Sequence, residues 1–217
     1  FHPLKRGFNE FFGFLGGGHQ YFPAALHIVD PLSVDDEGAS YKTKLNRGLA
    51  VVEEQEYITD AFSREAVSFV DRNRNNPFFL YLTYNAPHSP LQAPDQYLSR
   101  FKHIADSKRR TYAAMVSAID DGVGKLLDKL KETGQDKNTL LFFLSDNGGP
   151  LDNGSSNHPL TGKKGNLYEG GFRVPFAMQW PGVIAAGTVY EKPIISLDIF
   201  ATALGSLEKT VVTKNPL

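Results

Sequence analysis

The most informative stretch of this sequence is TLLFFLSDNGG at residues 139–149, an apolar run that ends in a polar turn. Residues 139–144 are almost continuously apolar, which is typical of a strand buried on both faces. The polar residues begin at Ser145, where such a strand would end. In layered α/β proteins the ligand site lies beyond the carboxyl ends of the strands, so this turn is a candidate site.

The elements around this stretch alternate between helix and strand. The spacing of apolar residues predicts helices at about residues 57–74, 108–132 and 197–207, and further strands at 78–84 and 174–180. Thr59 or Asp60 is expected to cap the first helix, and Gly134 to end the second. This alternation predicts an α/β fold with a largely parallel sheet flanked by helices.

The N-terminal 50 residues are rich in glycine, proline and aromatic residues and have little periodicity. They are expected to form irregular structure packed onto a larger body, with a polar surface excursion at residues 30–48. The chain has no initiator Met, so we expect it to begin inside a longer protein.

Bulk composition excludes several classes of protein. The chain has 217 residues, of which 41% are hydrophobic and 22% charged, as in ordinary globular proteins. A formal net charge of -1 gives no global attraction to nucleic acid or to a membrane. The absence of cysteine excludes disulfides and thiolate metal sites. Since no apolar run approaches ~18 residues, no membrane span is expected.

Two polar motifs follow predicted strands. Asp146 and Asn147 offer hard oxygen ligands suited to Ca²⁺ or Mg²⁺, although Asp-Asn-Gly is also ordinary turn chemistry. His88 lies between Pro87 and Pro90 in the loop after residue 84, where a stiff backbone would preorganise its imidazole. Such a histidine can bind an anion or act as a general acid, or it can simply hydrogen-bond within its own loop.

A third motif contains the lysines. Lys163 and Lys164 are flanked by Gly162 and Gly165, so their ammonium groups could approach an oxyanion. The alternative is a solvated lysine pair. Arg173 is a candidate substrate contact, although a structural ion pair with Glu169 is favoured.

Two further histidines are candidate substrate contacts. His19 follows three glycines and could reach a pocket, although a packing role is favoured. His158 lies shortly before the lysines and could line the substrate entrance, or it could be a surface residue.

Taken together, the order of these motifs strongly resembles the sulfatase family over essentially the whole chain. The matching segments are PFFLYL at 77–82 leading into NAPHSPLQAP at 85–94, LSDNGG at 144–149, GKKGNLYEGGFRVP at 162–175 and WPG at 180–182. The opening HPLKRGF at 2–8 also resembles the segment that follows the Gly-Lys-Trp-His motif of that family.

The resemblance implies an alkaline-phosphatase-like α/β fold and a metal-dependent sulfuric ester hydrolase. It implies that Asp146 and Asn147 are two ligands of Ca²⁺, with Mg²⁺ as the alternative. It also implies that Lys164 and His88 contact the sulfate, with His88 or Lys164 assisting departure of the alcohol. Lys164 matches better than Lys163 because it stands immediately before Gly165.

Parts of the sulfatase pattern are missing from the sequence. Sulfatases use a formylglycine made from Cys or Ser in a Cys/Ser-x-Pro-x-Arg segment, and no such segment occurs here. We therefore expect residues 1–217 to be a partial catalytic domain, with the nucleophile segment and a C-terminal subdomain outside it. By itself the chain is expected to be inactive.

Alternatives stay open at this point. A phosphatase or phosphonate hydrolase of the same superfamily makes similar demands on its site, and a non-catalytic carbohydrate-binding domain is a different class of function. The expected partner is a sulfated small molecule or polysaccharide, without nucleic acid or membrane. The resemblance favours a periplasmic or extracellular location, and the sequence does not fix the oligomeric state.

Overall fold

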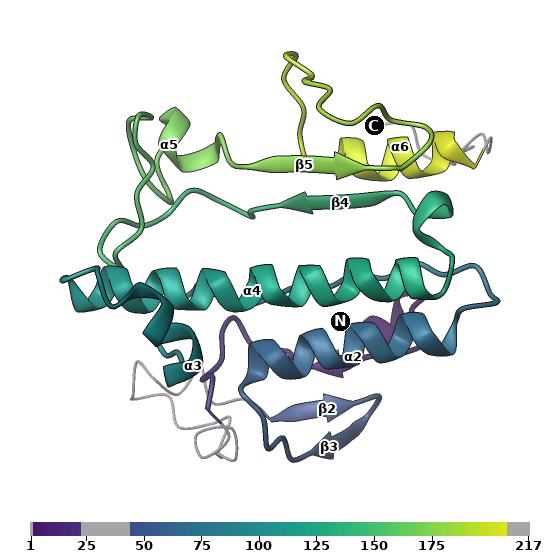
Figure 1. Cartoon of the computed structure of the whole chain (residues 1–217), viewed down its shortest axis with the longest axis horizontal. Coiled ribbons are helices and arrows are strands. Elements are labelled where there is room, and N and C mark those ends of the chain that lie inside the picture. Colours follow the sequence, from purple (N-terminus) through teal and green to yellow (C-terminus); the bar gives the residue numbers. More distant parts are fainter. Residues whose placement is uncertain (1, 23–43, 208–217) are drawn as a thin grey trace.

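The chain is built in layers of helices and sheets, described here from a computed structural model for residues 2–22 and 44–207. Its two longest helices, α2 (Ile58–Arg72) and α4 (Ser107–Glu132), pack against each other. A sheet of β4 (Leu141–Leu144) and β5 (Phe176–Gln179) lies on the α4 side of this pair (Figure 1). This arrangement confirms the predicted α/β class.

The described residues also form shorter elements. They are η1 (Pro3–Lys5), β1 (Phe12–Gly13), β2 (Leu45–Arg47), β3 (Ala50–Val52), α3 (Asp95–Leu98), η3 (Ser99–Phe101), η4 (Asp136–Asn138), α5 (Glu169–Phe172) and α6 (Asp198–Ser206). In the described residues, no helix is both long and apolar enough to cross a membrane.

Helix α2 begins differently from the prediction. Its N-cap is Tyr57, whose side chain makes no capping hydrogen bond to the helix. Thr59 is buried, and the Asp60 carboxylate accepts a hydrogen bond of 2.5 Å from the Tyr97 hydroxyl of α3. The expected cap by Thr59 or Asp60 is therefore wrong, because docking of α3 uses the carboxylate instead.

Helix α4 matches the predicted range, and Gly134 adopts a φ of +72° just beyond its end. The helix packs closely on α2 because small residues line the contact. A Cβ on Gly122 would overlap the Ser63 hydroxyl of α2 and crowd the Tyr84 hydroxyl. Ser63 in turn lies 2.9 Å from the Tyr84 oxygen and donates to the Thr59 carbonyl at 2.8 Å.

Residues 78–84 form an extended segment that has no paired strand in the described part of the chain. Phe78, Leu80 and Leu82 pack against the core between α2 and α4. Phe79 and Tyr81 point the other way, and each is 69% exposed. The predicted strand buried on both faces is thus an extended segment with one buried face.

The strand directions also differ from the prediction. β5 runs antiparallel to β4, with Leu141 opposite Gln179 and Leu144 opposite Phe176. The pairs β1–β2 and β2–β3 are antiparallel as well, so the expected largely parallel sheet is wrong for the described strands. The connection from β4 to β5 runs through loops and the one-turn helix α5, whereas parallel neighbours are usually joined by a crossover helix.

The N-terminal region contains a small sheet that the sequence did not predict. Phe12 of β1 lies opposite Arg47 of β2, whose guanidinium is 4.9 Å from the centre of the Phe12 ring. Phe12 also packs edge-on against Phe62 of α2. Most of the expected polar excursion at residues 30–48 lies outside the described residues.

Candidate active site

The Ser145–Gly149 segment, here called the DNGG loop, leaves the end of β4. The Ser145 N–H donates to the Pro175 carbonyl at 3.2 Å, so the loop begins where the strand pairing ends. Asp146 is exposed and Asn147 is half-buried. The Asn147 amide nitrogen donates to the Gly148 carbonyl at 3.2 Å, which leaves its amide oxygen as the atom suited to a cation.

The glycines of this loop allow backbone to pack on backbone. A Cβ on Gly148 would overlap the Gly170 carbonyl of α5, and the Gly148 N–H donates to the Gly171 carbonyl at 3.0 Å. A Cβ on Gly171 would in turn overlap the Asn166 carbonyl. Close approach of backbone to backbone therefore accounts for these glycines.

Residues 161–165, here called the lysine loop, lie directly against the DNGG loop. The Lys164 N–H donates to the Gly149 carbonyl at 3.3 Å, and the Thr161 carbonyl accepts from the Gly170 N–H at 2.7 Å. The side chains of Lys163 and Lys164 are exposed. The structure therefore brings two of the three predicted motifs together through their backbones.

Asn157 is a residue of this region that the sequence analysis missed. Its Oδ1 accepts the Gly149 N–H at 2.8 Å, and its Nδ2 donates to the carbonyls of Gly149 at 2.8 Å and Gly162 at 3.0 Å. The signal available in the sequence was its position immediately before His158. His158 itself is exposed, in keeping with either of its two interpretations.

Arg173 forms the ion pair that was its alternative role. Its Nη1 lies 3.3 Å from Glu169 Oε1, one helical turn earlier, and both side chains are more than half exposed. This pair spans α5, the helix that carries Gly170 and Gly171.

The residues around His88, here called the His88 loop (85–94), are held by a second set of hydrogen bonds. The Tyr21 hydroxyl donates to the His88 carbonyl at 2.8 Å, and the Tyr57 hydroxyl donates to the Gln92 carbonyl at 2.8 Å. Burial raises the pKa of Tyr21 and of Tyr57 well above the ordinary tyrosine value, so both hydroxyls keep their protons. His88 Nδ1 lies 2.8 Å from the Ser89 carbonyl, which orients the ring.

His19 belongs to the packing behind this loop. It is 1% exposed, and its ring lies 4.8 Å from that of Phe14. Its carbonyl accepts from the Asn85 amide at 3.4 Å. This burial agrees with the packing role that was favoured for His19.

All of these loops gather at one end of the molecule. The segment after the DNGG loop docks on the start of α4, where Lys108 Nζ and Arg109 Nη1 donate to the carbonyls of Asp152 at 3.3 Å and Gly154 at 2.9 Å. The His88 loop leads into α3, which lies at the same end of α4 in Figure 1. Convergence of His88 itself with Asp146 and Lys164 stays a prediction.

A metal ion would find only part of its ligands here. In residues 2–22 and 44–207, no group of three or more His, Asp or Glu side chains could hold a metal ion. Asp146 and Asn147 have the oxygen donors that Ca²⁺ prefers, but Ca²⁺ takes about six to eight oxygens. The pair fits as part of a ligand set and does not complete one.

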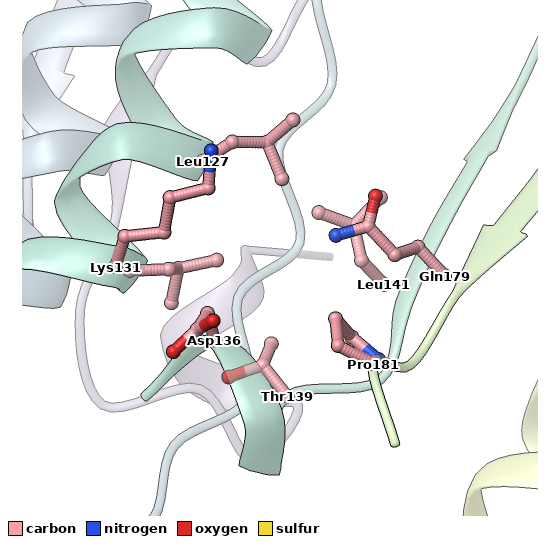
Figure 2. A pocket seen from close by; sticks show the side chains of 8 residues that line it. Leu127, Lys131, Asp136, Thr139, Leu141, Gln179 and Pro181 are labelled. Atoms are coloured by element: carbon pink, nitrogen blue, oxygen red, sulfur yellow. The ribbon is translucent and has the colours of Figure 1, made fainter. Parts of the chain in front are cut away.

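A pocket of about 110 Å³ lies elsewhere, at the opposite end of β4. Leu127 and Lys131 of α4, Asp136, Leu141 and Gln179 line it, together with Leu130, Thr139 and Pro181 (Figure 2). It contains none of the predicted site residues, so we do not assign it to the candidate site.

Comparison with known proteins supports one family. A family model described as Sulfatase matches residues 3–209. N-acetylgalactosamine-6-sulfatase of Mus musculus is 37% identical over 213 residues, which cover 94% of this chain and 39% of that protein. The uncharacterized sulfatase YdeN of Escherichia coli (strain K12) is 34% identical, covering 96% of this chain and 35% of that protein.

A similar solved structure is that of Ps i-CgsB in complex with k-i-k-neocarrahexaose. It is 47% identical with a TM-score of 0.90, and the match covers 97% of this chain and 48% of that one. The chain thus spans less than half the length of these relatives.

Proposed function

This chain belongs to the sulfatase family, and from that premise we propose that the full-length protein hydrolyses a sulfate ester with the help of a divalent metal ion. The observation that carries this proposal is the hydrogen bond from the Lys164 N–H to the Gly149 carbonyl. Because of it, the loop with oxygen ligands and the loop with ammonium groups are neighbours.

The proposed metal is Ca²⁺, with Asp146 and Asn147 supplying two of its oxygen ligands. Such an ion would supply stabilisation of negative charge on the sulfate oxygens. Family membership also implies a formylglycine nucleophile, for which this chain has no matching segment. We therefore propose that residues 1–217 are a partial catalytic domain, with the nucleophile segment and a C-terminal subdomain elsewhere in the protein.

Lys164 and His88 are the proposed catalytic residues. Negative charge grows on the bridging oxygen as the S–O bond breaks, and an ammonium or a protonated imidazole stabilises that charge. A proton from His88 or Lys164 would then leave with the alcohol. Lys163, Arg173, His158 and His19 are weaker candidates for substrate contacts, since Arg173 has an ion-pair partner and His19 is buried.

The proposed substrate is a sulfated carbohydrate. The support comes from Ps i-CgsB, which is 47% identical and was solved with an oligosaccharide, and from the N-acetylgalactosamine-6-sulfatases. A periplasmic or extracellular location is proposed with it, because sulfated polymers occur mostly outside the cytoplasm. Cell fractionation with an antibody to the protein tests the location.

The activity test compares the full-length protein with residues 1–217 alone. Inorganic sulfate release is measured from sulfated oligosaccharides and an aryl sulfate, with and without EDTA, and phosphate release from the matching phosphate esters. We expect EDTA-sensitive sulfate release by the full-length protein and none by the shorter chain. Preferential hydrolysis of the phosphate esters would show a phosphatase instead.

Binding without hydrolysis would have a different signature. If the full-length protein bound a sulfated oligosaccharide with saturation in calorimetry but released no sulfate, it would be a carbohydrate-binding protein. That outcome would refute the proposed enzymatic function.

A further inference from the structure

Asn157 uses both ends of its side-chain amide. Oδ1 accepts the Gly149 N–H at 2.8 Å, while Nδ2 donates to the Gly149 carbonyl at 2.8 Å and to the Gly162 carbonyl at 3.0 Å. One side chain therefore binds both polar groups of one glycine and reaches a second glycine thirteen positions later in the chain.

The two glycines belong to different halves of the candidate site. Gly149 ends the DNGG loop, and Gly162 lies in the lysine loop. The Gly149 carbonyl also accepts the Lys164 N–H at 3.3 Å. A Cβ on Gly149 would overlap the Ser155 hydroxyl and approach Asn157 Oδ1 at 3.4 Å, so the amide fits against the bare backbone.

The chemistry at this position requires an amide. Asparagine offers an acceptor and two donors on a short side chain, whereas ionised aspartate only accepts and alanine does neither. An aspartate would also place its charge beside two carbonyl oxygens. Glutamine carries the same groups one methylene further out.

We infer that Asn157 is a positioning residue that clamps the lysine loop to the DNGG loop and so fixes Lys164 relative to Asp146 and Asn147. The inference rests on the proposed function for the roles of those three residues. Asn157 acts through the backbone of both loops and has no assigned contact with substrate or metal. Outer residues that orient ligands in this way typically affect metal affinity or activity by 10–100-fold.

The first measurement tests the contact between the two loops and does not depend on catalysis. Hydrogen–deuterium exchange is followed in Asn157→Ala and in the control Asn153→Ala, whose Oδ1 accepts the Ser155 N–H at 3.0 Å inside the same segment. We expect at least tenfold faster exchange in peptides covering 145–149 and 161–165 for Asn157→Ala. Asn153→Ala should leave both peptides unchanged, and α2 and α4 should exchange as in the wild type.

The second measurement uses the full-length enzyme and its sulfate release. Asn157→Ala should lower kcat/KM by about 10–100-fold, and this loss should be smaller when excess Ca²⁺ is added. Asn153→Ala should lower kcat/KM by less than about threefold. Asn157→Asp should regain activity relative to wild type as the pH falls toward 4, because a protonated carboxyl can donate again. A merely structural role would not produce that pH profile.

The outcomes separate this inference from the function on which it rests. If the wild-type enzyme releases no sulfate, the proposed function fails, while the exchange data still decide whether Asn157 joins the two loops. If Asn157→Ala also speeds hydrogen exchange in α2 and α4, Asn157→Asp takes its place, and its exchange is measured in the same two loop peptides. Equal exchange and equal kcat/KM for the Asn157 and Asn153 variants would overturn the inference.

Discussion

Glu65 of α2 is held by two arginine side chains. Arg47 donates through both terminal nitrogens to the two Glu65 oxygens at 2.7 and 2.8 Å, and Arg64 donates at 3.0 Å. Chiefly because of the hydrogen bonds from Arg47, the pKa of Glu65 falls from its ordinary 4.5 to about 2. This carboxylate joins the N-terminal sheet to α2.

A depressed pKa makes stability depend on pH in a definite direction. The contribution of Glu65 is fully present above about pH 4.5 and is lost as the pH falls through about 2, because the unfolded chain takes up the proton first. Glu65→Gln should lower the free energy of unfolding by about 1 kcal/mol at pH 7 and flatten its slope between pH 4.5 and 2. Urea denaturation at several pH values measures both effects.

The control is Glu10→Gln. Glu10 lies 2.7 Å from Arg72, but both side chains are about half exposed, so its loss should change stability little. Equal slopes in the two variants would contradict the role of Glu65.

The two adjacent lysines allow a matched test of the catalytic assignment. Lys164→Ala in the full-length enzyme should lower kcat/KM by about 100-fold or more, because an ammonium that meets the developing charge is lost. Lys163→Ala should lower it by less than about tenfold. Comparable losses, or the larger loss at Lys163, would show that the roles were assigned to the wrong lysine.

The sequence predicted the chemistry of single residues better than it predicted the residues that hold them in place. Asp146, Asn147 and Lys164 could be singled out because charged and amide side chains carry their chemistry in their identity. Asn157 and Tyr21 could not, since their importance lies in hydrogen bonds to the backbone of residues distant in the chain. Such partners become visible only once the loops are placed.

Among the helices, the contact between α2 and α4 depends on one glycine. Gly122→Ala should destabilise the chain by about 1–3 kcal/mol, because its Cβ would overlap the buried Ser63 hydroxyl. Gly124→Ala, two positions later in the same helix, has no atom within 4 Å of the new Cβ and should stabilise by about 0.5–1 kcal/mol. Thermal unfolding of the two variants should therefore shift in opposite directions, and equal shifts would contradict this packing.

Helices were predicted well from the sequence because their signal is local. The apolar stripe and Gly134 gave α4 to within a residue. The helix caps and the segment 78–84 were not predicted well, because they depend on tertiary partners. Asp60 serves α3 rather than its own helix, and only one face of the 78–84 segment is covered.

For the molecule as a whole, large apolar side chains lie on the outside of the described part. Phe79 and Tyr81 are 69% exposed, Phe200 is 67% exposed, and Phe143 and Met178 of the β4–β5 sheet are more than 40% exposed. Residues 1–217 alone should therefore bind a hydrophobic dye and self-associate. The double variant Phe79→Ser/Tyr81→Ser should reduce dye binding without loss of helical signal, and unchanged dye binding would contradict this description of the surface.

The α/β class was predictable because helices and strands alternate along the chain, whereas the strand directions were not. The direction of β5 depends on the path of residues 145–175, whose glycines pack loop against loop in a way that periodicity does not encode. For the same reason, the sequence could name the motifs of the site but not their contacts.

The most direct test of the central claim is a crystal structure of the full-length protein with Ca²⁺ and a sulfated oligosaccharide. We predict one ion at about 2.4 Å from oxygens of Asp146 and Asn147. Lys164 and His88 should lie at about 3 Å from oxygens of a sulfate bound beside that ion. An ion bound to other residues, or a sulfate more than about 10 Å from Lys164 or His88, would contradict the account, since hydrogen bonds do not reach so far.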